Sequence, residues 1–402
     1  MQGHLTAAQA AEELGVSLPT LYAYVSRGLV RSRPEPGTRR RWYAAEDVWL
    51  LKQRKEQRRD PARAAEEALH QGLPAIESRL SVIRDGRLYY RGRDVCTLAV
   101  GCTLEQVAAL LWMGDVDASL PGDTIEVPAQ EWKSWCKLVA GLPSLEAFEV
   151  LLPLLAARDP AAYDTRPASV QRTGAKIVRA LAAAAVGARP SRDEIALVLQ
   201  RGWSAPSADD RFLLRAALVL YADNGINPSS FTARCVASAG STPYALVLAG
   251  LAALQGTKHG GACERAEALL EEAGDPSGAR RAVEARLRRG EAVPGFGHPL
   301  YPLGDPRGAL LMQLLIERRG RSREVALATA LADAVRDLTG QAPNVDFGVV
   351  TLCRALKLPP GSALALLGIG RTVGWIAHGL EQYQEGRLIR PRARYAGEPP
   401  QG

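Results

Sequence analysis

Apolar residues recur every three or four positions along most of the chain beyond about residue 100, the spacing of helices that bury one face. Alternation of apolar and polar residues predicts a few short strands only around Asp85-Gly86. The pattern therefore predicts a large, mainly α-helical domain with a sizeable core, and the lack of a fixed repeat argues against a solenoid. The predicted helices span residues 103–113, 144–157, 169–186, 211–222, 243–254, 262–273, 307–319, 323–338, 347–356 and 362–383.

Two shorter helices are predicted near the N-terminus. Thr6 and Gln9 match a capping box, and Gly15 is a suitable C-terminal stop for the first helix. Ser17 can cap a second helix, which Gly28 ends. Two short helices joined by a tight turn form a helix-turn-helix, and the second is the right size for a DNA major groove.

The second helix carries Leu18, Leu21 and Val25 on one face, which we expect to pack on the first helix. A Pro/Gly turn and an arginine run follow, as in a hairpin wing along DNA phosphates. Residues 5–52, "LTAAQAAEELGVSLPTLYAYVSRGLV…RRRWYAAEDVWLL", resemble a MerR-type helix-turn-helix. A helical protein-interaction module with a solvated basic face is the alternative. The candidate DNA-contacting residues are Thr20, Tyr22, Tyr24, Arg27, Arg39, Arg40 and Arg41.

Charge and cysteine usage narrow the class of protein. The net charge is +7 over 402 residues, and residues 1–60 carry eleven Lys/Arg against seven Asp/Glu, which favours a polyanionic partner for that segment. The six cysteines form no C-x-x-C pair, so we expect no metal site. Neither an export signal nor a long uncharged apolar run is evident, so we expect a cytoplasmic protein with no membrane span.

Glycine and proline interrupt the helical pattern at three places that each hold a polar residue. His259 precedes two glycines in "KHGGA", His298 lies in "VPGFGHPLY", and Asp346 lies in "PNVDF" at a predicted helix start. A carboxylate can remove a proton from a carbon beside a carbonyl, and a neutral imidazole can donate to the forming enolate. A second imidazole can polarise the electrophile. The three residues therefore fit condensation of a thioester with a ketone.

Other interpretations of these three residues stay open. They also fit a hydrolytic triad, although no serine in a G-x-S-x-G setting is evident. Taken singly, a loop histidine can be structural, and an aspartate near a helix start can be a cap or a dipole partner.

Several motifs occur in the order typical of citrate synthases: "ADNGINPSSFTARCVASAGSTPYALVLAGLAALQGTKHGGA", "PGFGH…DPR", "PNVDF" and "RTVGWIAHGLEQ…RLIRPR…Y.G". Residues 77–398 are therefore identified as resembling the citrate synthase family. The resemblance implies an all-α homodimer with a large and a small domain and an active site in the cleft between them. It also implies an acyltransferase of the tricarboxylic acid cycle, with oxaloacetate and acetyl-CoA as substrates and no bound cofactor.

The resemblance also implies a role for each motif residue. Asp346 would take a proton from the acetyl methyl, His259 would donate to the thioester oxygen, and His298 would activate the oxaloacetate carbonyl. Guanidinium groups suit planar carboxylates, and Arg307 and Arg371 would clamp the keto-acid, with Arg390 supplied by the partner subunit. The loop that would wrap the adenine of CoA comprises Val293, Pro294, Gly295, Phe296 and Gly297.

Two positions depart from the family pattern. Asn224 stands in "ADN" where the family commonly has a histidine that binds the keto-acid, and Pro299 stands where it commonly has an arginine. An amide can donate to a carboxylate but carries no charge. The acyl chain and the keto-acid therefore stay open, and 2-methylcitrate formation from propionyl-CoA is an alternative to citrate formation.

The function also has an alternative of another class. A transcription regulator could use a synthase-like domain only to sense oxaloacetate or acyl-CoA, and double-stranded DNA would then be its main partner. The expected domains are a MerR-like domain over 1–60, a connector over 61–76, the first part of the large domain over 77–260, the small domain over 261–357 and the rest of the large domain over 358–402.

Overall fold

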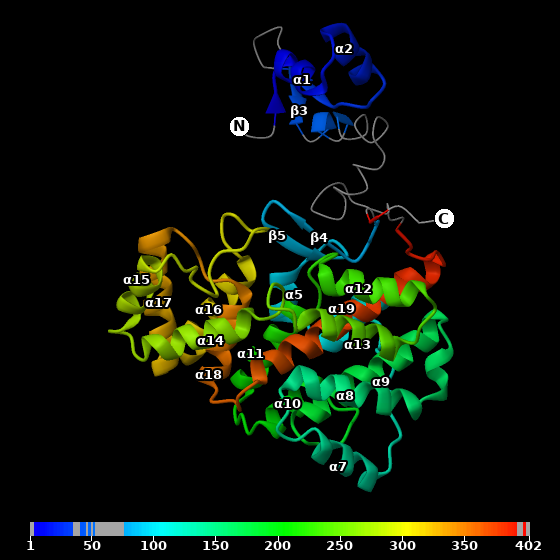
Figure 1. Cartoon of the computed structure of the whole chain (residues 1–402), viewed down its shortest axis with the longest axis vertical. Helices are drawn as coiled ribbons and strands as arrows, with labels where there is room; N and C mark the ends of the chain where they lie inside the picture. The colour runs from blue at the N-terminus through cyan, green and yellow to red at the C-terminus, as the bar shows by residue number, and fades with distance from the viewer. Residues whose placement is uncertain are drawn as a thin grey trace. The chain divides into compact units, whose positions relative to one another are not determined.

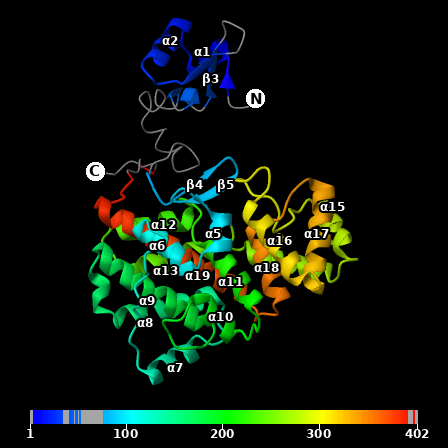
Figure 2. The same cartoon turned by 180° about the vertical axis from the view of Figure 1, so that it is seen from behind.

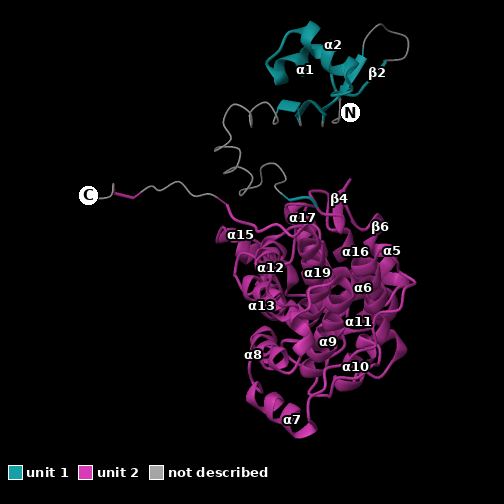
Figure 3. Ribbon diagram, turned by 90° about the vertical axis from the view of Figure 1, so that its right-hand side faces the viewer, with its two compact units in different colours: residues 1–77 teal, residues 78–402 magenta. Residues whose placement is uncertain are grey.

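The structure is a computed structural model that describes residues 4–34, 41–45, 47–49, 51–52, 76–391 and 397–398 (Figure 1). The chain divides into two compact units, residues 1–77 and residues 78–402 (Figure 3). Nearly all of the connector predicted over 61–76 lies outside the described residues, as do two candidate DNA-contacting residues, Arg39 and Arg40.

In its described residues, the first unit contains the short helices α1 and α2 and a three-stranded antiparallel sheet of order β1-β3-β2. Thr6 caps α1 in a full capping box, and Gly15 ends it in the left-handed conformation, as the sequence predicts. Tyr43 of β3 pairs with both Leu5 and Ser32, and its side chain is buried with the helices. The elements are β1 (His4–Leu5), α1 (Ala7–Leu14), α2 (Leu18–Ser26), β2 (Ser32–Pro34) and β3 (Arg41–Ala44).

The buried face of α2 differs from the prediction. Leu21 is fully buried, but Leu18 is 41% exposed, and Tyr24, which was expected to face outward, packs against the core. The apolar stripe of this short helix therefore runs through Leu21, Tyr24 and Val25 at i, i+3 and i+4 rather than back to its first residue. Tyr22 is 50% exposed and therefore lies on the solvent-facing side of α2.

The second unit opens with a small antiparallel sheet of order β4-β5-β6. Its strands are β4 (Ser81–Arg84), β5 (Arg87–Tyr90) and β6 (Arg93–Asp94). Asp85 and Gly86 join the first two strands, both with positive φ, at 52° and 72°. Two such residues form a hairpin turn whose twist matches the flanking strands, and the predicted strand pair is thereby confirmed.

Every helix predicted beyond residue 100 is present, and three have the predicted bounds. Five more were missed: α5, α7, α10, α12 and α15. The helix α15 has the sequence ARRAVEARLR, whose many charges leave too few apolar positions to reveal a helical period. The helices are α5 (Val95–Gly101), α6 (Leu104–Met113), α7 (Ala129–Leu138), α8 (Ser144–Ala157), α9 (Pro167–Ala185), α10 (Ile195–Gly202), α11 (Ala208–Tyr221), α12 (Pro228–Ser238), α13 (Pro243–Leu254), α14 (Ala262–Ala273), α15 (Ala279–Arg288), α16 (Pro306–Arg319), α17 (Arg323–Thr339), α18 (Val345–Ala355) and α19 (Ser362–Glu385), with a 3-10 turn η1 (Pro160–Tyr163).

The long helix α19 forms the centre of the second unit (Figures 1 and 2). It packs against α9, α11, α12 and α13. Among the described helices it alone is long and apolar enough to cross a membrane, but its most apolar window is wholly buried, which identifies a core helix. Gly374 permits a close approach to the end of α11, because a Cβ there would lie 2.3 Å from the Ala222 carbonyl oxygen.

Helices α14 to α18 gather on one side of the second unit (Figure 1). Within this group α16 packs on α18, α15 packs on α17, and α14 contacts both α15 and α18. The group corresponds to the segment 261–357, whose status as a separate small domain stays a prediction. It meets the rest of the unit where α16 and α18 contact α11.

Candidate active site

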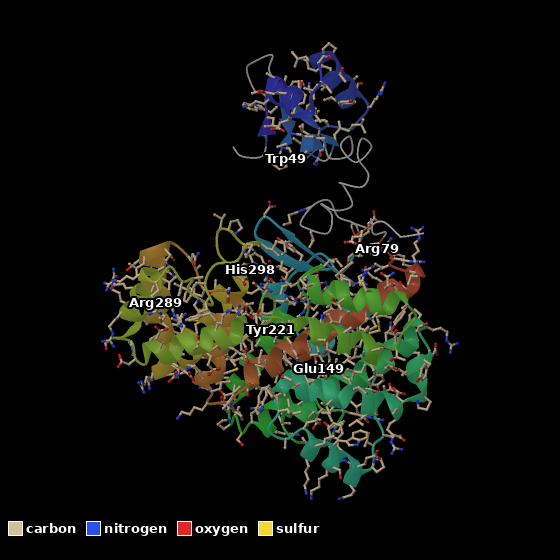
Figure 4. The ribbon with its side chains drawn as sticks, viewed as in Figure 1. Trp49, Arg79, Glu149, Tyr221, Arg289 and His298 are labelled. Carbon is tan, nitrogen blue, oxygen red and sulfur yellow. The ribbon has the colours of Figure 1, made fainter. Side chains whose placement is uncertain are left out.

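Two of the three polar residues singled out in the sequence lie at or just before helix starts, and the third lies within a loop. His259 is in the turn between α13 and α14, His298 is in the loop between α15 and α16, and Asp346 is the second residue of α18. Figure 4 labels His298, near the β4–β5 hairpin and α16, and Tyr221, near α11 and α19. The glycine and proline breaks therefore correspond to turns, loops and starts of helices.

The loop before His298 is hydrogen-bonded to the segment before Asp346. The Asn344 backbone N–H donates to the Gly295 carbonyl over 2.9 Å, and the Gly297 N–H donates to the Ala342 carbonyl over 2.9 Å. Gly295 has φ +85°, and a Cβ there would lie 3.0 Å from Phe347. Only glycine fits this close approach without strain, so Gly295 allows the loop to pack directly against the start of α18.

Asp305 ties the start of α16 to the start of α18. Its Oδ1 caps α16 by accepting from the Arg307 N–H over 3.0 Å, and its Oδ2 accepts from the Val345 N–H over 3.0 Å. The same carboxylate accepts from Nε and Nη2 of Arg307 over 3.0 and 2.9 Å. Although burial opposes the charge, Asp305 and Tyr301 raise the pKa of Arg307. Arg307 is therefore a fixed, fully buried cation.

Asn224 is hydrogen-bonded to Arg307. Its Oδ1 accepts from Nη1 of Arg307 and from the Tyr301 hydroxyl, each over 3.4 Å. Tyr301 also lies beside His298, with ring centroids 5.0 Å apart. With both donors on Oδ1, the amide N–H groups are left to donate to a ligand. Tyr301 therefore lies next to all three of Asn224, Arg307 and His298, since the Arg307 guanidinium also lies 5.1 Å from the Tyr301 ring.

His298 has a defined proton position. The Leu300 N–H donates to its Nδ1 over 3.1 Å, so the proton of the neutral ring is on Nε2. Burial lowers the pKa of His298 and Arg307 adds to the effect, while Asp305 and Asp346 oppose it.

His259 is also neutral at ordinary pH. Burial, and then the charge of Arg371, lowers the pKa of His259 to about 4. Its Nε2 lies 2.9 Å from the Ser229 hydroxyl, which accepts from Nε1 of Trp375 over 3.1 Å. The single Ser229 proton can go to His259 or to Asn227 Oδ1, 2.9 Å away. When it goes to His259, the ring proton is on Nδ1.

Arg371 is the second buried guanidinium of the site. It projects from α19, donates from Nη2 to Ser230 over 2.8 Å and pairs with Asp223 at 3.4 Å. Its Nε is buried without a partner among the described residues. Although burial favours the neutral acid, His378 and Arg371 hold the pKa of Asp223 well below its usual range. The Nε–H of Arg371 is therefore a donor that the described residues leave unsatisfied.

The remaining predicted residues divide between the site and the surface. In the loop 293–297, Phe296 is buried on Phe347 with ring centroids 4.6 Å apart, so its side chain is part of the core. Arg390 follows the end of α19 and is exposed in the single chain, so its predicted role in a partner's site stays a prediction.

Several residues of the site were not predicted from sequence. Asp305 entered the sequence analysis only as part of the motif "DPR", and Ser229, Tyr221, Cys263 and Tyr301 were not singled out at all. Their position beside motif residues, in "YADN", "NPSSF", "HGGAC" and "HPLY", was the one local signal available. Among the described residues, no group of three or more His, Cys, Asp or Glu side chains could hold a metal ion.

Comparison with known proteins identifies the family of this chain. The family model described as "Citrate synthase, C-terminal domain" matches residues 68–392. A citrate synthase of Haloferax volcanii is 31% identical over 364 residues, which are 82% of this chain and 95% of that protein. A 2-methylcitrate synthase of Mycobacterium tuberculosis is 31% identical over 338 residues, 77% of this chain and 84% of that protein.

The fold comparison leads to the same family. The crystal structure of citrate synthase from Thermotoga maritima MSB8 is similar with a TM-score of 0.69 and 28% identity, covering 81% of this chain and 94% of that one. The mainly helical, citrate-synthase-like fold expected from sequence is thereby confirmed, whereas the winged helix-turn-helix assignment of the first unit stays a prediction. The chain belongs to the citrate synthase family and is a citrate-synthase-like enzyme.

Proposed function

We propose that the second unit condenses acetyl-CoA, or propionyl-CoA, with oxaloacetate to give citrate, or 2-methylcitrate, and free CoA. The observation that supports the proposal is that His298, with its proton on Nε2, lies beside Tyr301, which in turn contacts Asn224 and Arg307. Relatives named citrate synthase and 2-methylcitrate synthase, each 31% identical, support the same reaction type and leave both acyl chains open.

The proposed reaction begins at the acyl carbon next to the thioester. Asp346 removes a proton from this carbon. His259, in the tautomer that accepts from the Ser229 hydroxyl at Nε2 and carries its proton on Nδ1, donates to the thioester oxygen as the enol forms. The carbon then attacks the ketone carbon of oxaloacetate, and Nε2–H of His298 protonates the new alkoxide. Water must finally cleave the thioester to release CoA.

The keto-acid carboxylates would be held by guanidinium groups. Arg307 is a fixed buried cation, and Arg371 has a buried Nε–H without a partner in the described chain. A carboxylate oxygen would satisfy that donor and recover the cost of its burial. We expect a homodimer in which the second copy contributes Arg390, and we expect the backbone of the loop 293–297 to contact the adenine of CoA.

Release of the CoA thiol tests this proposal directly. The protein is mixed with acetyl-CoA or propionyl-CoA and oxaloacetate, and the free thiol is followed with a colorimetric reagent. Asp346→Asn should abolish release while the protein stays folded. Asp333→Asn, which removes a carboxylate from the exposed face of α17, should release CoA at the wild-type rate. Lack of release by wild-type protein with any of several keto-acids and acyl-CoAs would refute the proposal.

For the first unit we propose a second function, binding of double-stranded DNA. Its two helices, an antiparallel strand pair and the exposed Tyr22 and Arg27 support this, as does the resemblance to MerR-type domains. If the chain is instead a regulator whose second unit only senses metabolites, DNA binding will respond to oxaloacetate or acyl-CoA while no CoA is released.

Salt dependence tests the DNA proposal. Binding of a dimer to duplex DNA should favour a palindromic site and should weaken steeply as salt rises. Arg27→Ala should reduce both the affinity and the slope of that dependence, whereas Arg288→Ala, on exposed α15, should change neither. Absence of duplex binding at low salt, or a slope unchanged by Arg27→Ala, would contradict the proposal.

A further inference from the structure

Two donors that the proposed reaction does not use reach the carboxylate of Asp346. The Tyr221 hydroxyl donates to its Oδ1 over 2.8 Å, and Sγ of Cys263 lies 3.6 Å from the same oxygen. The hydroxyl and the sulfur are themselves 3.5 Å apart. An ionised carboxylate only accepts, so the phenol proton points to Asp346, and the weaker thiol proton is shared between the two oxygens.

Both donors are locked in place by their positions in the fold. Tyr221 is the last residue of α11, and Cys263 and Asp346 are each the second residue of their helices, α14 and α18. Tyr221 is 3% exposed and Cys263 is 1% exposed. Three helix ends therefore meet at Oδ1, and the described residues place no donor on Oδ2 of Asp346.

Neither donor can act as a base or a nucleophile itself. Burial, with the negative charge of Asp346, raises the pKa of Tyr221 well above its usual range. The same two causes raise the pKa of Cys263 well above its usual range. Both groups thus keep their protons throughout the working range of the enzyme and act only as permanent hydrogen-bond donors.

We propose that Tyr221, assisted by Cys263, is the positioning residue for the base. By holding Oδ1 of Asp346 it stops rotation of the carboxylate and leaves Oδ2 directed at the acyl carbon. Misplacement of a catalytic group by about 1 Å can cost a hundredfold in rate. A hydrogen bond to the ionised carboxylate also favours the ionised form. The inference rests on the proposed role of Asp346 as the base.

Tyr221→Phe tests the inference because it keeps the ring and removes only the donor. We expect kcat to fall about 10- to 100-fold, the size of a hydrogen bond to a charged group. The KM for acetyl-CoA should stay within about threefold, since Tyr221 does not bind substrate. The acid limb of the kcat profile should move to higher pH, because the ionised base has lost a donor. A merely structural role for Tyr221 would not move that limb.

Matched variants separate positioning from packing. Tyr244→Phe removes another buried tyrosine that donates to a buried aspartate, Asp159, over 3.0 Å, and should leave the pH profile unchanged. Cys263→Ala should reduce kcat less than Tyr221→Phe does, and Cys263→Ser, which retains a donor, should restore it. A kcat and an acid limb of Tyr221→Phe equal to those of wild-type protein would overturn the inference.

The hydrogen bond to Asp346 can also be tested without enzymatic turnover, by NMR of the Asp346 carboxyl group. Carboxyl carbon NMR of protein labelled at aspartate, with Asp346 identified by its loss in Asp346→Asn, follows the titration of this group. Tyr221→Phe should move its midpoint to higher pH, and Tyr244→Phe should not. If wild-type protein releases no CoA, the proposed function is refuted, and an unmoved midpoint would separately refute the hydrogen bond.

Discussion

Protonation of His259 should destabilise the fold as the pH falls. Burial and Arg371 lower the pKa of His259 from 6.5 to about 4. Between these values the unfolded state binds a proton that the folded state does not, so stability falls as pH drops below 6.5, and the loss ends near pH 4. At about 1.36 kcal/mol per pKa unit, the loss between pH 7 and pH 5 is about 2 kcal/mol. The ring is only part-buried, so screening by solvent reduces this to about 1 to 2 kcal/mol.

His259→Gln isolates this contribution. Glutamine can still hydrogen-bond to Ser229 but does not titrate. The free energy of unfolding is measured by denaturant titration at pH 7, 6 and 5, for both proteins at one concentration so that subunit association contributes equally. The wild-type protein should lose about 1 to 2 kcal/mol more than His259→Gln between pH 7 and pH 5.

Equal losses in the two proteins would refute the reasoning. His259 would then titrate in the folded state as it does in the unfolded chain. A ring that is cationic below pH 6.5 would not remain the neutral donor that the proposed enolisation requires, so the same result would weaken that step.

Two further predictions concern the residues that hold the site together. Asp305→Asn should lower the free energy of unfolding by about 3 to 5 kcal/mol because it leaves the buried Arg307 cation without a counter-charge. Denaturant titration should show the loss partly recovered in Asp305→Asn/Arg307→Met, and a double variant as unstable as the single one would contradict this. Gly295→Ala should cost about 1 to 3 kcal/mol more than Gly290→Ala. Both glycines have positive φ, but only a Cβ at 295 meets Phe347, and equal losses would mean that this contact is loose.

Secondary structure was predicted best where it depends on local pattern. The bounds of α8, α13 and α14 coincide with the predicted ranges, because apolar spacing within each segment is a property of that segment alone. The charged helix α15 was missed because it has too few apolar positions to show the period. The exposure of Leu18 and the packing of Tyr24 were wrongly predicted, because the buried face of α2 depends on what surrounds it.

The sequence by itself determined which residues could do chemistry. His259, His298 and Asp346 interrupt the helical pattern beside glycine and proline, so their place in the turns, loops and starts of helices followed from local backbone preferences. Their motifs and order also identified the family.

Only the tertiary structure decided how these residues meet and what state they are in. Tyr221 reaches Asp346 across 125 positions of sequence, and Arg307 reaches Asn224 across 83. The neutral state of His259 likewise follows from burial and from Arg371, which is far away in the chain. Local preferences act over one or two helical turns, whereas hydrogen-bond partners and desolvation depend on which helix ends are packed together.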